Sequence, residues 1–262
     1  MKGAIIKIEH LCLRLANQQI LDNIYLQVEA GDYISIIGPN GAGKTSLLKC
    51  LLRIYSISAG RIFFHGVPLS NFGQKDLAKQ ISYVPQSSES IFPFAVEEFV
   101  MMGRYPFLNP FSSLKATDKK AVQEAMALCD VSHNVNRLMK TLSGGERQVV
   151  YIAAALAQGS DILLLDEPTT FLDPNYQSKI YRLLKRLNTE LGKTIILVTH
   201  DINSAVLQGE RVIVLKQGKI LFDGDGKKIM DNKLLKNAYD KEFDFTIHPF
   251  TGQKIILPEV LA

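Results

Sequence analysis

The sequence has no apolar run long enough to cross a membrane as a helix. Its longest apolar stretches, residues 149–157 and 195–198 among them, fall far short of the roughly 20 residues that a spanning helix needs. The N-terminal residues mix charged side chains into their apolar ones and offer no signal-peptide core with a small-residue cleavage site. Any link to a membrane is therefore expected to run through another protein.

Cysteine and clustered charge are also scarce. Cys12, Cys50 and Cys129 are scattered without the spacing of metal ligands, so we expect reduced, packed thiols and a cytoplasmic protein. The formal net charge is +4, but the basic residues are dispersed and form only short clusters, such as residues 115–120. We therefore expect no nucleic-acid partner.

The first third of the chain has the pattern of an α/β fold. Residues 24–28 alternate between apolar and polar, Gly31 turns the chain, and residues 33–37 run mostly apolar into a glycine-rich loop. Further short strands are expected at residues 61–64 and 81–84. With 262 residues, 47% of them hydrophobic, the chain lies near the upper size for a single domain.

A helical stretch interrupts this pattern. Between Gln86 and Leu142 the strand signals fade, and Val122, Met126 and Cys129 recur at helical spacing. The α/β pattern then resumes. We expect a strand at 162–165, a helix from Asp173-Pro174 to Gly192, a strand at 194–198, a hairpin at 217–218, a charged helix at 227–239 and a turn at 251–252.

Residues 38–45 read Gly-Pro-Asn-Gly-Ala-Gly-Lys-Thr, the pattern of a phosphate-binding loop. Its small residues let backbone N–H groups cradle phosphates, and the start of a helix adds positive potential. We expect Lys44 to hold the β- and γ-phosphates, Thr45 to bind Mg²⁺ and Ser46 to bind the α-phosphate. The alternative is an ordinary glycine turn, but the flanking strand and helix favour a nucleotide site. The predicted nucleotide-binding residues are Gly38, Pro39, Asn40, Gly41, Ala42, Gly43, Lys44, Thr45 and Ser46.

An apolar run ends in two carboxylates, Asp166 and Glu167. This is expected for a buried parallel strand whose carboxyl end faces a ligand. Asp166 is predicted to hold Mg²⁺, through water, and Glu167 to act as the general base on the attacking water. A strand followed by a solvated turn would explain the run alone, but the phosphate-binding loop favours the catalytic interpretation.

Residues 142–146 read Leu-Ser-Gly-Gly-Glu and have two compatible interpretations. Ser143 and Glu146 form the capping box of a helix that runs to Ala157. Ser143, with the bare backbone N–H groups of Gly144 and Gly145, also presents a positive helix end to an anion. The sequence alone establishes the cap.

Together these motifs resemble the ABC ATPase family over nearly the whole chain. The resemblance implies an α/β fold: a P-loop NTPase core with an antiparallel β subdomain and an inserted helical subdomain. We expect one domain over residues 1–262, with the core at 1–86 and 142–262 and the helical subdomain at 87–141. It also implies that two copies form a homodimer, in which the segment 143–145 contacts the γ-phosphate held by the partner.

The remaining family elements map onto Gln86, Asp173 and His200. The resemblance implies that Gln86 contacts Mg²⁺ or the γ-phosphate and couples the nucleotide to subdomain rotation. It places Asp173 at the dimer contact and His200 between the γ-phosphate and Glu167. Each is weak alone, because a turn glutamine or a lone histidine is more often structural.

Two further segments look like the importers of ferric siderophores, haem and cobalamin. They are Met-Gly-Arg-Tyr-Pro-Phe at 102–107 and Thr-Thr-Phe-Leu-Asp at 169–173, and residues 245–258 look like that group's closing hairpin. The resemblance implies ATP and Mg²⁺ as ligands. It also implies two permease subunits at the cytoplasmic face of the cell membrane, fed by a substrate-binding protein.

Three positions depart from the family pattern. Leu15 stands where an aromatic residue commonly stacks on adenine, and Val149 and Ala154 replace frequent arginines. Alternative functions are a soluble ABC ATPase acting on ribosomes or DNA, or a degraded cassette without turnover. The spacing from Gln86 to Leu142 leaves no room for a long coiled coil, and the intact Lys44 and Glu167 argue against degradation.

Overall fold

The computed structural model describes residues 4–86, 93–109 and 113–258. The chain divides into two compact units, the first made of Met1–Leu69 and Ile196–Ala262 and the second of Ser70–Ile195. Within the described residues, no helix has the length and apolar character to cross a membrane. The predicted division at residues 86 and 142 stays a prediction, and residues 87–92 and 110–112 lie outside the described part.

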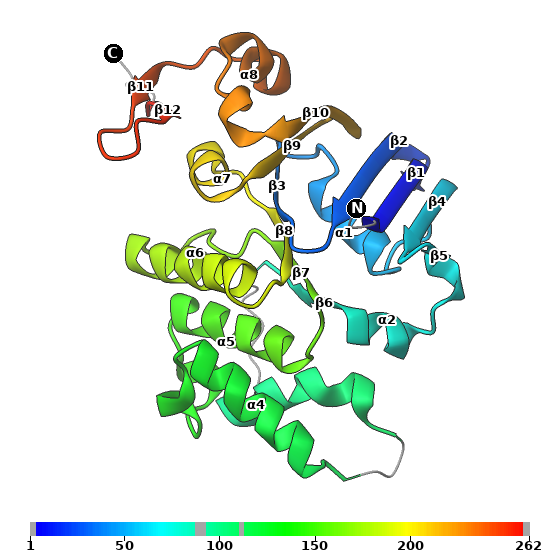
Figure 1. Ribbon diagram of the computed structural model, residues 1–262, viewed down its shortest axis with the longest axis vertical. Coiled ribbons are helices and arrows are strands. Elements are labelled where there is room, and N and C mark those ends of the chain that lie inside the picture. The colour runs from blue at the N-terminus through cyan, green and yellow to red at the C-terminus, as the bar shows by residue number, and fades with distance from the viewer. Residues whose placement is uncertain (1–3, 87–92, 110–112, 259–262) are drawn as a thin grey trace. The chain divides into compact units, whose positions relative to one another are not determined.

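The first unit contains an antiparallel sheet of order β2-β1-β4-β5 and a second run of strands in the order β10-β9-β3-β8 (Figure 1). The alternating burial of β2 shows that this strand packs one face, as its sequence predicts. In contrast, β3 is buried throughout and pairs in parallel with β9. The bounds are β1 Ala4–Leu15, β2 Gln18–Glu29, β3 Tyr33–Ile37, α1 Lys44–Leu51, β4 Ala59–Phe64, β5 Val67–Pro68, β8 Thr194–Val198, α7 Ile202–Gln208, β9 Arg211–Lys216 and β10 Lys219–Asp225.

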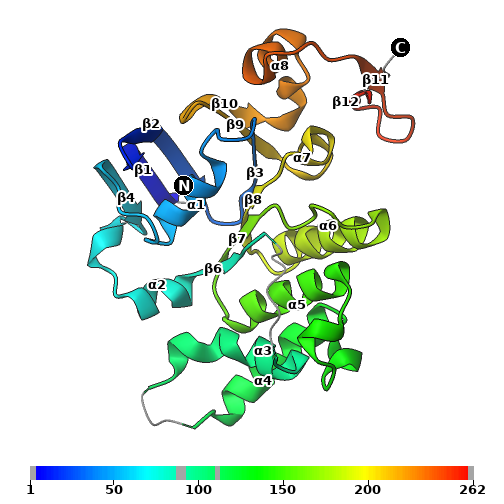
Figure 2. The ribbon, with the colours of Figure 1, turned by 180° about the vertical axis from the view of Figure 1, so that it is seen from behind.

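The C-terminal part of this unit differs from the sequence prediction. The charged helix expected at 227–239 is two shorter elements, the 3-10 turn η5 (Gly226–Ile229) and the helix α8 (Asn232–Tyr239), seen beside β9 in Figure 2. The break arises because the Asp231 side chain accepts the backbone N–H groups of the first turn of α8 and so begins a new helix. A final hairpin joins β11 (Phe245–Ile247) to β12 (Lys254–Ile256).

The second unit carries one parallel strand pair and most of the long helices. Strand β6 pairs with β7, and α3, α4 and α5 pack against one another (Figures 1 and 2). The described part of 87–141 contains α3, η2, α4, η3 and η4, and its assignment to a separate subdomain stays a prediction. The helix α6 begins after Asp173, as predicted, but ends before Gly192. The bounds are η1 Leu69–Asn71 at the junction of the two units, α2 Gln74–Gln80, β6 Ile81–Val84, α3 Val96–Met101, η2 Met102–Phe107, α4 Ala116–Leu128, η3 Ser132–Asn134, η4 Met139–Thr141, α5 Gly144–Ala157, β7 Ile162–Asp166 and α6 Pro174–Thr189.

Candidate functional site

The phosphate-binding loop is shaped by glycines that leave no room for a side chain. A Cβ on Gly38 would lie 2.0 Å from the carbonyl oxygen of Leu215, and Gly38 has a φ of +147°. A Cβ on Gly43 would lie 2.7 Å from the Leu21 side chain. By contrast, Gly41 has open space around it. The loop is therefore a backbone cradle closed on its protein side and open at Gly41, which fits a phosphate chain.

Lys44 lies inside this cradle. Its side chain is almost fully buried, with 6% of the residue exposed, and its ammonium donates to the carbonyl oxygens of Gly38 (2.7 Å) and Pro39 (3.1 Å). A buried ammonium needs acceptors, and the loop supplies two through its own backbone. Thr45 and Ser46 follow on the first turn of α1. The residues present thus fit the phosphates of a nucleotide.

The loop is also held by a turn that the sequence motif did not reveal. The backbone N–H of Gly218, in the turn between β9 and β10, donates to the carbonyl oxygen of Ala42 at 3.1 Å. The carbonyl oxygen of Gly218 in turn accepts from Asp22 at 2.9 Å. Its sequence signal was the predicted hairpin at 217–218, which gave no hint of this contact.

His200 and Leu15 complete the predicted residues of the first unit. His200 is exposed and lies between β8 and α7, where Asp201 caps the helix through the N–H of Ser204. Leu15 is partly buried at the end of β1. His200 follows a strand, as predicted, and Leu15 ends one; their roles toward a nucleotide stay predictions.

In the second unit, Asp166 ends the buried strand β7 and is only 4% exposed. The hydroxyl of Tyr83, on the neighbouring strand β6, donates to Asp166 Oδ2 at 3.2 Å. This bond fixes the direction of one carboxylate oxygen, as outer partners of metal ligands do. Tyr83 was not predicted, and its only sequence signal is its place three residues before Gln86.

Glu167 is held on a tight turn with its carboxylate oriented by two side chains. Its φ is +47°, the left-handed region that few side chains adopt. The hydroxyl of Thr170 donates to Glu167 Oε2 at 2.9 Å, and Gln86 Nε2 lies 3.4 Å from the same oxygen. The structure thus brings the predicted Gln86 and Glu167 together and adds Thr170, which the sequence analysis missed.

The helix start at Ser143 has the predicted capping box. Glu146 accepts from the backbone N–H of Ser143 at 2.8 Å, and the Ser143 hydroxyl accepts from the backbone N–H of Glu146 at 3.2 Å. Arg137 adds an ion pair to Glu146 at 2.9 Å. The backbone N–H of Ser143 and then Arg137 lower the pKa of Glu146. Arg137 therefore supplies a charge partner at this helix start.

Two predicted contact segments of the second unit lie against each other. A Cβ on Gly145 would lie 2.3 Å from the ring of Tyr176, and one on Gly144 would lie 3.8 Å from Leu172. Asp173 itself caps α6 by accepting from Asn175 at 2.9 Å. The segment 143–145 and the segment 171–173 therefore form one continuous face.

Phe171 stands out on this face. It is 93% exposed and has a φ of +62°, an unusual conformation for a bulky residue. The turn is closed behind it, because the backbone N–H of Leu172 donates to Thr169 at 3.3 Å and Gln177 Nε2 donates to Leu172 at 3.0 Å. The loop thus holds an aromatic ring in solvent.

The donor set for a metal is small. Among the described residues, no group of three or more His, Cys, Asp and Glu side chains could hold a metal ion. The predicted metal residues Thr45, Gln86 and Asp166 offer a hydroxyl, an amide and a carboxylate. Oxygen donors of this kind suit Mg²⁺, which takes its remaining ligands from phosphates and water.

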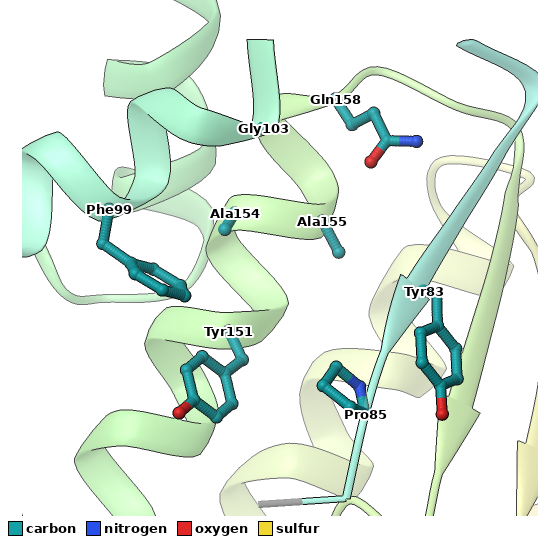
Figure 3. Close-up of a pocket in the computed structure, with 8 residues that line it drawn as sticks. All are labelled: Tyr83, Pro85, Phe99, Gly103, Tyr151, Ala154, Ala155 and Gln158. Atoms are coloured by element: carbon teal, nitrogen blue, oxygen red, sulfur yellow. The ribbon is translucent and has the colours of Figure 1, made fainter. Parts of the chain in front are cut away.

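We call Asp166 and Glu167, with Tyr83, Gln86 and Thr170 that contact them, the carboxylate cluster. A pocket of about 190 Å³ lies beside it, in the second unit (Figure 3). Tyr83 and Pro85 form one wall, and Phe99, Tyr151 and Ala154 come from α3 and α5. The lining is mainly apolar. Pro85 directly precedes Gln86, so the wall of the pocket continues into the site.

Comparison with known proteins gives consistent likenesses. The sequence profile described as ABC transporter matches residues 21–170. The iron(3+)-hydroxamate import ATP-binding protein FhuC of Bacillus subtilis is 35% identical, over 95% of this chain and 93% of that protein. A metal-chelate type ABC transporter solved in an inward-facing conformation has a TM-score of 0.86 at 26% identity, over 99% of this chain and 98% of that chain.

A second solved structure is a dimeric ATP-binding cassette in a post-hydrolysis state, bound to ADP and Pi. It has a TM-score of 0.72 at 29% identity, over 84% of this chain and 98% of that chain. These likenesses confirm the predicted fold class and the predicted ATPase activity. The chain belongs to the ABC transporter family, as one of its ATP-hydrolysing cassettes.

Proposed function

We propose that this chain powers the import of a ferric siderophore or a related iron, haem or cobalamin compound, by closing as a homodimer on ATP. The substrate class is supported by the likeness to FhuC, whose name specifies iron(3+)-hydroxamate import. The dimer is supported by the likeness to a cassette solved as a dimer with ADP and Pi. A soluble role on ribosomes or DNA gains no support from these relatives.

The continuous face of segments 143–145 and 171–173 carries the proposal. The start of α5 presents bare N–H groups at Gly144 and Gly145, which attract an anion. The phosphate-binding loop of the first unit is assigned to the chain's own nucleotide. We therefore assign an anion at the start of α5 to the nucleotide of a second copy. The exposed Phe171 beside this helix start suits a protein contact.

The residues divide the work at each nucleotide. Lys44 leaves the loop carbonyls and pairs with the phosphates, while the glycine cradle donates its N–H groups. Thr45, Asp166 and Gln86 would hold Mg²⁺, which would neutralise phosphate charge. Glu167, oriented by Thr170, accepts a proton from the attacking water, and His200 donates to the γ-phosphate.

We assign the apolar pocket at Tyr83 to a cytoplasmic segment of the permease. Phe99 and Tyr151 give it an aromatic wall, and Met102 and Phe107 on the adjoining η2 are exposed. Exposed apolar side chains beside a pocket mark a protein contact. Because Pro85 leads directly into Gln86, a permease segment seated here is next to the catalytic cluster.

The dimer is tested with the Glu167→Gln variant, which loses the base but keeps every binding group. Light scattering after size exclusion should give a dimer mass with Mg-ATP and a monomer mass with Mg-ADP or without nucleotide. The chain has no tryptophan, so Phe171→Trp in this background adds a single reporter. Its emission should shift to shorter wavelength only with Mg-ATP.

The matched control is Phe250→Trp, because Phe250 is also 93% exposed but lies in the β11–β12 hairpin. The wavelength of its emission should not change when nucleotide is added. A monomer in every condition, confirmed with the co-purified permease present, would contradict the proposal. Identifying that permease also tests the substrate class.

A further inference from the structure

Tyr83 faces two features of the second unit at once. Its ring lines the apolar pocket, and Pro85 lies between this ring and Tyr151 of α5 in the view of Figure 3. Its hydroxyl donates to Asp166 Oδ2 at 3.2 Å. One side chain therefore connects the surface of the pocket to the carboxylate predicted to hold the metal.

The strand that carries Tyr83 is fixed firmly to the wall of the same pocket. Gln158, another lining residue, donates from Nε2 to the carbonyl oxygen of Ile81 on β6 at 2.9 Å. The buried hydroxyl of Ser160 donates to that of Ser82 at 2.8 Å. A change in the wall at α5 is thus passed to β6, because these bonds leave the strand little freedom to move alone.

Asp166 depends on this arrangement for its direction. It is buried at the end of β7. Tyr83 pairs with Leu164 in the parallel register of β6 and β7, and its hydroxyl reaches Asp166 two residues further along β7. A hydrogen bond to a charged carboxylate is stronger than one between neutral groups. Moving the ring of Tyr83 therefore changes the direction of the Asp166 carboxylate.

We propose that Tyr83 is a positioning residue that sets the direction of the Asp166 carboxylate according to what fills the pocket. This inference rests on the proposed function, since it takes Asp166 as a metal ligand and the permease as the occupant. It adds a second link between pocket and site, separate from Gln86. The chemistry that Tyr83 controls is metal affinity, whereas Gln86 contacts Glu167.

The test is Tyr83→Phe in the full chain at a fixed ATP concentration, measured against the concentration of free Mg²⁺ both by ATP hydrolysis and by equilibrium binding of a fluorescent ATP analogue. The ring and the pocket remain, and only the hydroxyl is lost. The Mg²⁺ concentration for half-maximal rate should rise about three- to tenfold, the effect of one lost hydrogen bond to a charged group in a partly exposed setting. The limiting rate should stay within about twofold and the melting temperature should not fall.

Tyr33→Phe is the control, because it removes a buried tyrosine hydroxyl from β3 of the first unit. It should leave the Mg²⁺ dependence unchanged. An unchanged Mg²⁺ dependence in Tyr83→Phe would overturn the proposal while leaving the ATPase assignment intact. Absence of any Mg²⁺-dependent hydrolysis by the unaltered protein would overturn both.

A second variant tests the link to the pocket. Ala154→Leu places a larger side chain in the pocket and leaves the residues Tyr83 and Asp166 unaltered. It should shift the Mg²⁺ concentration for half-maximal rate, and this shift should vanish in the Tyr83→Phe background. Equal shifts in both backgrounds, or none in the unaltered background, would overturn the link.

Discussion

The phosphate-binding loop and the carboxylate cluster are built by different means. In the loop, the backbone itself forms the site, and glycine stands where any Cβ would strike a neighbour, as at Gly38 and Gly43. In the cluster, side chains orient other side chains, as Tyr83 does for Asp166 and Thr170 for Glu167. A substitution at these glycines of the loop removes the site by steric overlap. A substitution in the cluster removes one hydrogen bond and leaves the remaining contacts in place.

The largest effect is expected from Gly38→Ala in the loop. The new methyl would overlap a backbone oxygen of Leu215, which no side-chain rotation can relieve. We expect loss of ATP binding and a stability loss of at least about 3 kcal/mol. Gly41→Ala is the matched control, because only the φ of +77° opposes an alanine there, at a conformational cost of about 1–2 kcal/mol. Thermal melts measure the stability of both variants, and ATP titrations measure their binding. Equal losses of stability and ATP binding in the two variants would refute the prediction.

The next effect concerns the face proposed to meet a partner's nucleotide. Gly144→Asp should reduce hydrolysis by about tenfold or more, because it sets an anion against a phosphate. ATP binding to a single protomer should be nearly unchanged. The hydrolysis rate of Gly144→Ala should be close to that of the unaltered protein, since the nearest side chain to its Cβ is 3.8 Å away. Gly145 is less suitable, because a substitution there must also move Tyr176. Undiminished hydrolysis in Gly144→Asp would exclude the contact across protomers.

A smaller effect is expected from Thr170→Val in the carboxylate cluster. The substitution keeps the shape of the side chain but removes the hydroxyl that orients Glu167. The hydrolysis rate should fall about tenfold, a part of what a general base contributes, while ATP affinity stays the same. Steady-state kinetics and equilibrium binding separate the two quantities. A change in affinity alone would show that Thr170 acts on the nucleotide instead.

The smallest effect concerns pH and the cap at Ser143. The pKa of Glu146 is lowered by the Ser143 backbone and Arg137, so its contribution to stability is present above the unfolded pKa of about 4.3. That contribution is lost as the pH falls through the lower folded pKa. Glu146→Gln should reduce the loss of unfolding free energy at acid pH by less than about 1 kcal/mol, since Arg137 is partly exposed. Urea unfolding from about pH 3 to pH 6 measures it, with the exposed Glu124→Gln as control.

The same contrast explains what the sequence predicted and what it did not. The glycines and Lys44 of the loop follow a fixed spacing along the chain, so the motif alone predicted them, although the neighbours that exclude a Cβ at Gly38 and Gly43 are distant in sequence. Tyr83 and Asp166 are far apart in the chain and meet only because β6 and β7 pair in parallel. Their contact depends on a register that the pattern of apolar residues does not specify.

A helix cap inside the predicted helix explains the fold prediction that was wrong. The sequence at 227–239 has helical character, but Asp231 caps a new helix and divides the segment. The strands, the capping box and the α/β class were predicted because each follows from periodicity or from a cap of its own. The roles of the site residues stay predictions until the variants above are measured.

The two C-terminal hairpin turns, Gln217-Gly218 and Thr251-Gly252, look alike in sequence but differ in their tolerance of insertion. A Cβ on Gly218 would lie 2.5 Å from the Ile20 carbonyl oxygen, and the turn holds Ala42 by a hydrogen bond. Gly252 has open space around it. Extra length can therefore be added at Gly252, which makes that turn the natural place for an epitope or a fluorescent label, whereas the same insertion at Gly218 would distort the nucleotide loop.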